Sequence, residues 1–498
     1  MNENCDINEP STRTKYGYDT LNRLNGLANS WAGSFSFGYD ALSRRTSLTR
    51  PNGVNTSYGY DSVSHLLSVL HQAGVNTLDG ASYTYDSAGN RTSKTNYLNG
   101  VTSNYGYDPL YELTQVTQGA STTETYSYDA VGNRLSSLGV PNYNYNPSNE
   151  LTSSSSGSYT YDANGNTLSD AQGRSFTWDF ENRLTQAVVP GTNGGTTTFR
   201  YDPFGRRIQK SGPLGTTNYL YDWINLLQEL DVAGNTLARY VQGPGIDEPV
   251  AQLRSGITSY YHQDAARSVT SLSSSNPASD NSYDYDSFGT LAASSGNTAN
   301  SIRFMGREYD VETGIYEFRN RYYSAAVGRF MNEDPIGFAG GTNLYSFVTN
   351  DPIIHTDPFG WMVYKCTRPT HFGGILSFVD WLSQHGGPQH WWIKTDTKEA
   401  GLGQAGGGIP GGPGGGYTSQ TEIVDHTGES TQPGSTCIPE PDEDEDCVNR
   451  ELTIGQQMGL FLGQNNCHQL VNDIFDTCSK THPSRTPPIP HLTLLAPN

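Results

Sequence analysis

Long hydrophobic runs are missing from this chain, and aliphatic residues are few. Hydrophobic residues fill only 34% of its 498 positions, a share that is also found in disordered chains. No run of 18 apolar residues occurs, so the sequence predicts no transmembrane helix. The first 19 residues lack both a basic start and an apolar run, and a cleaved signal peptide is therefore not expected.

Basic residues and, before position 361, cysteines are also scarce. The chain has 30 Lys and Arg against 50 Asp and Glu, which gives a formal net charge of −20. Binding to nucleic acid or to an anionic membrane requires a basic patch, so neither is an expected partner of the bulk of the chain. Only Cys5 of the six cysteines precedes position 361. Disulfides therefore do not build this part of the fold.

Aromatic residues and glycine take the place of the missing aliphatic residues. The 32 Tyr, 17 Phe and 7 Trp make up 11% of the chain, and disordered chains lack such a content of rings. We therefore expect a folded protein with an aromatic core. The 55 Gly favour a turn-rich, all-β protein.

A tandem repeat runs through the first half of the chain. Each copy has an aromatic residue, any residue, then in most copies Tyr and Asp. Up to residue 222 the copies start 16 to 25 residues apart, and such a period predicts a repeat architecture. The copies start at Tyr16, Phe37, Tyr58, Tyr83, Tyr105, Tyr126, Tyr143, Tyr159, Phe176, Phe199, Tyr219 and Tyr283.

Each copy predicts one β-hairpin. Aromatic residues at positions i and i+2 lie on the same face of a strand. The following Asp ends the strand, where its carboxylate accepts N–H groups of the turn. Gly-Asn-Arg at 89–91 and 132–134 supplies a residue for a positive φ and starts the return strand. A single hairpin cannot bury its aromatic face, so we expect stacked neighbours to bury a Tyr ladder.

The stretch 301–361 has a pattern of its own and separates the repeats from a C-terminal part of different composition. Its ordered motif residues are Arg303, Phe304, Gly306, Arg307, Glu308, Tyr309, Asp310, Glu312, Thr313, Gly314, Arg319, Arg321, Tyr322, Tyr323, Gly328, Arg329, Phe330, Asp334, Pro335, Gly337, Asn343, Leu344, Tyr345, Asn350, Pro352, Asp357, Pro358 and Gly360. This set resembles the core signature of RHS/YD-repeat proteins, which include bacterial polymorphic toxins and Tc-toxin C components.

The resemblance implies a fold and three regions. The fold is mainly β, with antiparallel YD-repeat hairpins forming a shell that spirals into a cocoon-like sheet, followed by a small α+β domain. The regions are a YD-repeat shell at 1–235, an RHS core with a cleavage boundary at 236–361, and a variable effector domain at 362–498.

Two Asp-Pro-x-Gly segments, at Asp334 and Asp357, stand 23 residues apart. From local sequence alone both are turn formers. The resemblance implies that they form an aspartyl-protease-like pair that cuts the chain, with Arg321 as the supporting cation. The cut would fall between Trp361 and Met362, where Trp361 stands in place of the usual Leu. Two adjacent carboxylates do not both ionise easily, so one serves as acid and the other as base on a water.

The C-terminal part contains a candidate cysteine site. Cys467 opens a predicted helix at 467–480, and a helix N-terminus favours the thiolate. His390 lies in a strand-like run and would be the base, with His426 as a third polar member. The order of His and Cys resembles circularly permuted papain-fold enzymes such as lecithin retinol acyltransferase-like proteins. The alternative is that Cys467 is a buried or disulfide-bonded thiol.

The region after residue 361 is also expected to contain a strand and a further helix. Residues 421–425 alternate like a strand, and 450–463 have the spacing of a helix. No Cys or His pair has the spacing of zinc ligands, so we expect neither a metal nor another cofactor.

Three functions are open at this point. The first is a toxin-like protein whose shell encloses or presents an effector that is released after Trp361. The second is a non-enzymatic cell-surface or carbohydrate-binding repeat protein, and the third is a shell that carries a nuclease. The resemblance implies an immunity protein, further shell or plug segments and a target-cell protein or lipid as partners. It also implies a secreted or cell-surface location reached by a specialised secretion route.

Overall fold

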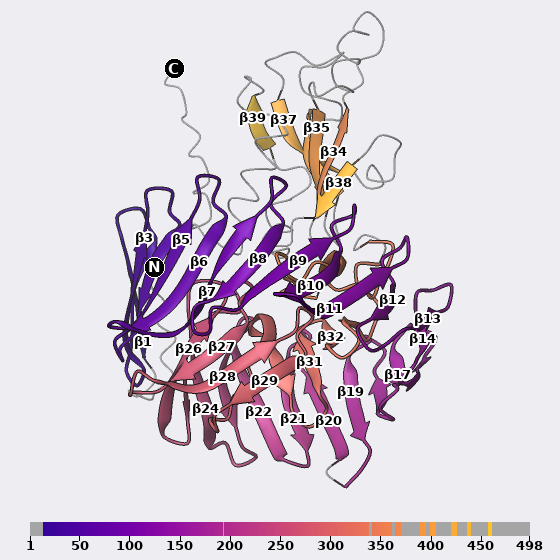
Figure 1. Ribbon diagram of the computed structural model, residues 1–498, viewed down its shortest axis with the longest axis horizontal. Helices are drawn as coiled ribbons and strands as arrows, with labels where there is room; N and C mark the ends of the chain where they lie inside the picture. The colour runs from indigo at the N-terminus through magenta and orange to yellow at the C-terminus, as the bar shows by residue number, and fades with distance from the viewer. Residues whose placement is uncertain are drawn as a thin grey trace, which may run out of the picture. The chain divides into compact units, whose positions relative to one another are not determined.

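The computed structural model describes residues 13–192, 194–337 and 341–360, together with the backbone of six strands between 364 and 460. These residues fall into two units (Figure 1). The first unit contains the residues up to Asp334 and Asn343–Gly360, and the second contains Pro335–Thr342 and the chain from Trp361 onward.

The YD repeats form consecutive antiparallel hairpins, which confirms the predicted mainly β fold. In the first sheet each strand pairs with its neighbours in sequence, in the order β1 to β12 (Figure 1). Its strands are β1 (Thr14–Tyr18), β2 (Leu24–Asn29), β3 (Gly33–Tyr39), β4 (Arg45–Thr49), β5 (Val54–Tyr60), β6 (Leu66–Ala73), β7 (Asn76–Tyr85), β8 (Arg91–Asn96), β9 (Thr102–Tyr107), β10 (Leu113–Gln118), β11 (Ser121–Tyr128) and β12 (Arg134–Ser137).

A short three-stranded sheet leads to a second large sheet of fourteen strands, again in sequence order. The short sheet contains β13 (Tyr143–Tyr145), β14 (Leu151–Ser154) and β15 (Gly157–Ser158). The large one contains β16 (Thr160–Tyr161), β17 (Thr167–Ser169), β18 (Ser175–Trp178), β19 (Leu184–Val189), β20 (Gly195–Tyr201), β21 (Arg207–Gly212), β22 (Gly215–Asp222), β23 (Asn225–Leu230), β24 (Thr236–Gln242), β25 (Pro249–Arg254), β26 (Ile257–Gln263), β27 (Val269–Ser273), β28 (Ser279–Tyr285) and β29 (Leu291–Ser295).

The Asp of most repeats closes its turn in the predicted way. At Asp202, Oδ1 accepts the N–H groups of Phe204 at 2.9 Å and Arg206 at 3.0 Å, and Oδ2 accepts the Arg206 Nε–H at 2.7 Å. The third turn residue, Gly205, has a φ of +80°, which glycine adopts without strain. Other Asp residues whose Oδ1 accepts the same two N–H groups are Asp19, Asp40, Asp61, Asp86, Asp108, Asp129, Asp162, Asp170, Asp179, Asp231, Asp264 and Asp286.

The second ring of a repeat ties it to the repeat before it. The Tyr128 hydroxyl donates to the carbonyl of Leu113 at 2.9 Å, at the start of the preceding return strand. The same backward bond, over 11 to 19 residues, is made by Tyr39, Tyr85, Tyr107, Tyr145, Tyr201, Tyr221 and Tyr285. First rings such as Phe37, Tyr83 and Phe176 are buried, which confirms the predicted aromatic ladder.

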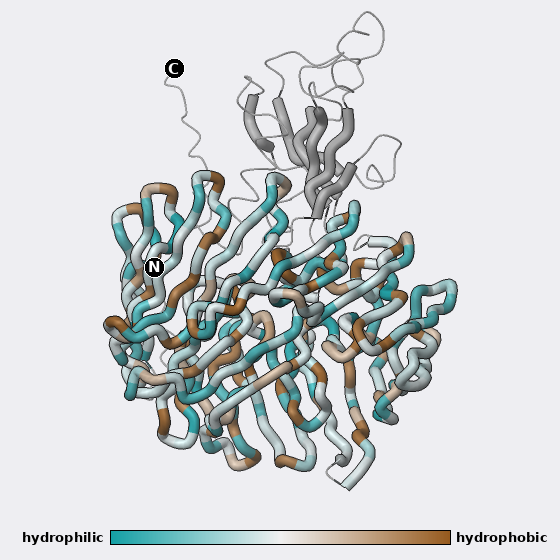
Figure 2. Tube along the Cα trace, viewed as in Figure 1, coloured by the Kyte–Doolittle hydropathy of each residue, from teal (hydrophilic) through white to brown (hydrophobic). Residues whose placement is uncertain are grey.

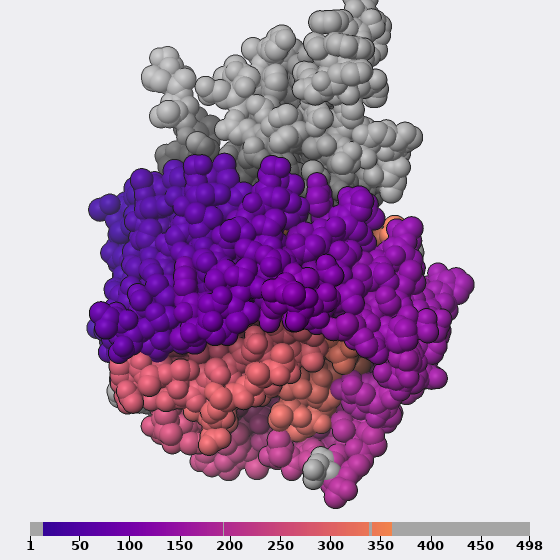
Figure 3. All heavy atoms as spheres, in the orientation of Figure 1, coloured from indigo at the N-terminus to yellow at the C-terminus, as the bar shows by residue number. Residues whose placement is uncertain are grey.

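Apolar and polar residues alternate along these strands, as Figure 2 shows by colour. The apolar faces of the first and second sheets meet at strands β2–β4 and β24–β26, where Leu27, Phe35 and Leu48 share a core with Val250 and Tyr260. In Figure 3 the two sheets, indigo to purple and magenta to salmon, meet along a seam with orange atoms of the region after residue 300 between them.

A four-stranded sheet packs between the twelve-stranded first sheet and the fourteen-stranded second sheet. It contains β30 (Glu308–Asp310), β31 (Ile315–Phe318), β32 (Arg321–Ser324) and β33 (Arg329–Phe330), with short 3₁₀ turns at η2 (Phe304–Gly306) and η4 (Val348–Asn350). Phe318 and Tyr323 lie in a core with Leu113 and Val116 of the first sheet. Tyr322 lies in another with Phe199 of the second sheet.

The second unit has a six-stranded antiparallel sheet in the order β38-β34-β35-β36-β37-β39. Its strands are β34 (Tyr364–Pro369), β35 (Gln389–Lys394), β36 (Glu399–Gln404), β37 (Gln420–Asp425), β38 (Thr436–Pro439) and β39 (Gln457–Leu460). The strand predicted at 421–425 is confirmed by β37.

The helix predicted over 450–463 is wrong where β39 lies. Leu460 of β39 pairs with Gln420 of β37, and this edge pairing replaces the expected helix. Gly455, Gly459 and Gly463 each weaken a helix by about 1 kcal/mol, a cost that the spacing of the apolar residues hides. The helix predicted at 467–480 lies outside the described residues.

The predicted region boundaries stay predictions. The boundary after residue 361 lies one residue beyond Trp361, where the longer of the two segments of the second unit begins; its shorter segment, Pro335–Thr342, falls inside the predicted region 236–361. The boundary after residue 235 falls inside the second sheet, between β23 and β24.

Candidate active site

The structure brings together three predicted site residues that are spread over 37 positions. Arg321 begins β32, Asp334 follows β33, and Asp357 lies near the end of the first unit. The Arg321 guanidinium contacts both carboxylates: Nη1 lies 3.0 Å from Asp334 Oδ2, and Nη2 lies 3.0 Å from Asp357 Oδ2. One cation therefore bridges the two Asp-Pro-x-Gly segments.

Arg321 is fixed in place by its surroundings. Its Cζ atom lies 3.5 Å from the centroid of the Phe330 ring, and Nη1 also donates to the Leu344 carbonyl at 3.3 Å. The exposed fractions are 2% for Arg321, 2% for Asp357 and 6% for Asp334. Charges interact more strongly in such a buried environment than in water.

The second Asp-Pro-x-Gly segment folds back on its own carboxylate. Gly360 N–H donates to Asp357 Oδ1 at 2.7 Å. Gly360 has a φ of +74°, and a Cβ atom there would lie 2.8 Å from the Phe318 carbonyl oxygen, so no larger residue fits without a shift. This turn holds the chain just before Trp361 against Asp357.

The residues beside Arg321 were missed by the sequence analysis. Arg319 Nη1 donates to the Pro358 carbonyl, and Asn320 Nδ2 donates to the Phe359 carbonyl at 3.0 Å. Arg319 was among the motif residues of the core signature, but no role was assigned to it, and the signal for Asn320 was its place directly before Arg321.

Several predicted site residues cannot be tested on this structure. Trp361, Met362, His426 and Cys467 lie outside the described residues. His390 lies on β35, whose backbone alone is described. The cysteine site therefore stays a prediction.

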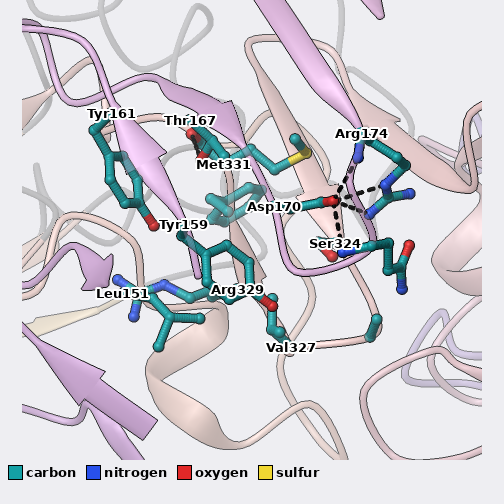
Figure 4. Close-up of a pocket in the computed structure, with 13 residues that line it drawn as sticks. Leu151, Tyr159, Tyr161, Thr167, Asp170, Arg174, Ser324, Val327, Arg329 and Met331 are labelled. Carbon is teal, nitrogen blue, oxygen red and sulfur yellow. Dashed lines mark hydrogen bonds and ion pairs between the residues drawn. The ribbon is translucent and has the colours of Figure 1, made fainter. Parts of the chain in front are cut away.

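A small cavity lies beside β17, between the second sheet and the four-stranded sheet (Figure 4). Its lining includes Tyr161, Asp170, Arg174, Arg329 and Met331. Its volume of about 20 Å³ holds roughly one water molecule, and Asp170 is already bonded to Arg174 Nε at 2.6 Å. The cavity is therefore no substrate pocket.

Two further searches covered the described residues only. Within them no three His, Cys, Asp or Glu side chains are grouped so that they could hold a metal ion. The same part of the chain has no helix with the length and apolarity to cross a membrane.

The family described as teneurin YD-shell matches residues 76–353, which is more than half of the chain. The tRNA3(Ser)-specific nuclease WapA of Bacillus spizizenii is 32% identical over 271 residues, covering 51% of this chain and 12% of that protein. The probable deoxyribonuclease RhsA of Dickeya dadantii is 30% identical over 225 residues, covering 40% of this chain and 14% of that protein. The matches thus cover a small part of these longer relatives.

A solved structure of TcdB2-TccC3-TEV is also similar. Its TM-score is 0.59 at 23% sequence identity, over 70% of this chain and 20% of that chain. At this identity the match shows a shared fold.

Proposed function

Because this chain belongs to the teneurin YD-shell family, we propose that it is the shell of a toxin that carries an effector after residue 361 and cuts its own chain there. The single observation that carries the proposal is the contact of Arg321 with both Asp334 and Asp357. The names of WapA and RhsA, a tRNA-specific nuclease and a probable deoxyribonuclease, support an effector that damages nucleic acid.

The arrangement suits hydrolysis by two carboxylates. With Arg321 offsetting one negative charge, Asp334 and Asp357 can share one proton, so that one acts as base and the other as acid. In the cut, water attacks the carbonyl carbon of Trp361 and gives a proton to the basic carboxylate. The acidic carboxylate gives its proton to the nitrogen of Met362. The carbon–nitrogen bond breaks and leaves a carboxylate on Trp361 and an amine on Met362.

Incubation of the purified chain tests the proposal. We expect the wild type to release a fragment whose N-terminal residue is Met362, seen by gel and N-terminal sequencing. Asp334→Asn and Asp357→Asn should stay intact, because each removes one of the two proton-transfer groups. Asp351→Asn is the matched control, since Asp351 is also buried and also precedes a proline. Cleavage of both site variants at the wild-type rate would rule out the aspartyl mechanism.

Trp361 provides a second test. It replaces the Leu that is usual before the cut in the resembling proteins, and a larger ring changes the fit of the side chain at this position. We expect Trp361→Leu to cut at least as fast as the wild type, as measured by the time course of fragment release.

The effector has two candidate chemistries. A nuclease is favoured by the relatives WapA and RhsA. A cysteine hydrolase or acyltransferase, with Cys467 as nucleophile, His390 as base and His426 as third member, is favoured by the sequence pattern. Cys467→Ala should abolish activity on a protein or lipid substrate, whereas Cys478→Ala should not. If Cys467→Ala retains degradation of tRNA or DNA, the nuclease reading holds.

The same proposal covers location and partners. A toxin shell acts outside the cell that makes it, so we propose secretion by a specialised route and a cognate immunity protein in the producing cell. Further shell segments of a larger toxin complex would complete the wall. Co-expression with candidate immunity proteins, read out as rescued growth, checks the pairing.

A further inference from the structure

We propose that Arg319 and Asn320 are positioning residues for the cut. They hold the carbonyls of Pro358 and Phe359, so that the bond between Trp361 and Met362 is presented to the two aspartates. This inference rests on the proposed function. It assigns to three successive residues two tasks: Arg319 and Asn320 hold the substrate segment, and Arg321 holds the carboxylates.

Arg319 and Asn320 hold the backbone just before residue 361 by a set of hydrogen bonds, which we call the grip. Arg319 Nη1 donates to the Pro358 carbonyl. The Phe359 carbonyl accepts two hydrogen bonds, from Asn320 Nδ2 at 3.0 Å and from the Asn320 backbone N–H at 3.3 Å. Gly360 N–H adds its bond to Asp357. Every residue from Pro358 to Gly360 is thereby fixed by a polar contact.

The backbone of Arg319 is strained in a way that points to its side chain. Arg319 and Asn320 form the two-residue turn between β31 and β32, and Arg319 has a φ of +56°. The first position of such a turn is normally glycine when its φ is positive. A residue with a side chain in the left-handed region carries strain of about 1 kcal/mol or more. An arginine at this position is explained by its contact with Pro358.

Arg319 is also held by Asp247, which belongs to the second sheet's connection between β24 and β25. Asp247, between β24 and β25, lies 2.8 Å from Arg319 Nη2 and 2.7 Å from Arg307 Nη1. Arg307 in turn lies 2.9 Å from Glu317. All four side chains are at most 15% exposed. The segment Pro358–Gly360, before the proposed cut, is therefore held relative to the second sheet as well as to Asp357.

Positioning of this kind affects rate steeply. A displacement of about 1 Å from the reactive geometry slows a reaction by roughly 100-fold. Loss of one carbonyl contact should therefore slow the cut without changing which groups transfer protons.

The experiment uses the full chain and measures the rate of fragment release at several pH values, with the mass of the fragment. Arg319→Gly relieves the strained φ but also removes the ion pair with Asp247, so the rate is compared after urea unfolding shows that the variant is folded. The folded variant should cut about 10- to 100-fold more slowly than the wild type. Asn320→Asp keeps size but replaces the donor with an acceptor, and should also slow the cut. Arg319→Lys keeps one charged donor and should cut faster than Arg319→Gly.

Ser255→Gly is the matched control. Ser255 is an exposed residue at the first position of another two-residue turn, between β25 and β26, with a φ of +53°. The Ser255→Gly substitution relieves backbone strain of the same kind at a position far from the site in sequence. It should leave the rate of fragment release unchanged.

The outcomes separate the two proposals. If the wild type cuts and Asp357→Asn does not, the proposed function stands. In that case an Arg319→Gly variant that cuts at the wild-type rate overturns the positioning role. A slowed Arg319→Gly with an unchanged pH profile and partial rescue by Arg319→Lys supports it. A shifted pH profile would instead make Arg319 part of the proton chemistry and overturn the positioning role. A wild type that stays intact, also as Trp361→Leu, overturns both proposals.

Discussion

The turn aspartates should differ in their contribution to the free energy of unfolding, because they differ in burial. Asp170 and Asp231 each accept hydrogen bonds from the backbone N–H groups two and four residues later, and each also contacts the side chain of the residue four positions later. The partner of Asp170 is the charged Arg174, and both side chains are 6% exposed. The partner of Asp231 is the neutral Asn235 on an exposed turn.

This difference predicts unequal losses of stability. Asp170→Ala leaves the buried Arg174 charge without a carboxylate, with the Thr313 carbonyl and the Phe176 ring as its remaining partners, and such a loss costs about 3 kcal/mol or more. Asp231→Ala should cost clearly less, because water replaces the lost contacts. Urea unfolding of both variants measures the two free energies. Equal losses would show that the turn bonds, and not the buried charge, determine the cost.

We expect two buried histidines, His71 and His262, to make the first unit less stable in acid. His71 and His262 have ring centroids 5.0 Å apart and join β6 of the first sheet to β26 of the second. Burial and the nearby Arg50 lower the pKa of His71 to about 4, against a partial opposing effect of Asp79. Burial, Arg50 and His71 lower the pKa of His262 well below its usual value.

The sign of the effect follows from proton counts. Between about pH 6.5 and pH 4 the unfolded chain protonates these histidines while the folded chain does not, so stability falls as the pH falls. We expect His71→Gln to lose less free energy of unfolding than the wild type between pH 7 and pH 4.5. Urea titrations at both pH values give the comparison. A variant with the wild-type pH dependence would contradict the assignment.

At the scale of the hairpin, the backward Tyr bond joins a repeat to the preceding one in eight places. Tyr128→Phe removes the bond to the Leu113 carbonyl and keeps the ring, so it should cost about 1 kcal/mol. Tyr97→Phe is the control, because Tyr97 is 39% exposed and should change little. Thermal unfolding of both variants measures the effect, and a neutral Tyr128→Phe would show that ring packing alone links the repeats.

The hairpins were predictable because their information is local. The ring spacing set the strand faces, and the Asp and Gly positions set the turns. The β39 strand was not predictable, because its pairing with β37 overrides the local pattern. The grip of Arg319 and Asn320 was also hidden, since it acts on backbone carbonyls 39 residues away, and a carbonyl has no signature in the sequence. Arg321, Asp334 and Asp357 were found only through the resemblance.

At the scale of the whole molecule, the first unit has its own core. Its apolar clusters are built from residues between Leu24 and Ile354. We therefore expect a chain that ends after Gly360 to fold by itself, with β-type circular dichroism and a cooperative thermal transition. A truncated chain that binds a hydrophobic dye and melts without cooperativity would show that the unit depends on the C-terminal part.

The strand order has a consequence for timing. Each strand of the two large sheets pairs with its neighbour in sequence, and local contacts form quickly. Chains also fold from the N-terminus as they are synthesised. Both walls can therefore form while Asp357, near the end of the first unit, is still inside the ribosome. Until that residue emerges, Arg321 has only one of its two carboxylates, so the order of translation itself delays the proposed cut until the two large sheets have formed.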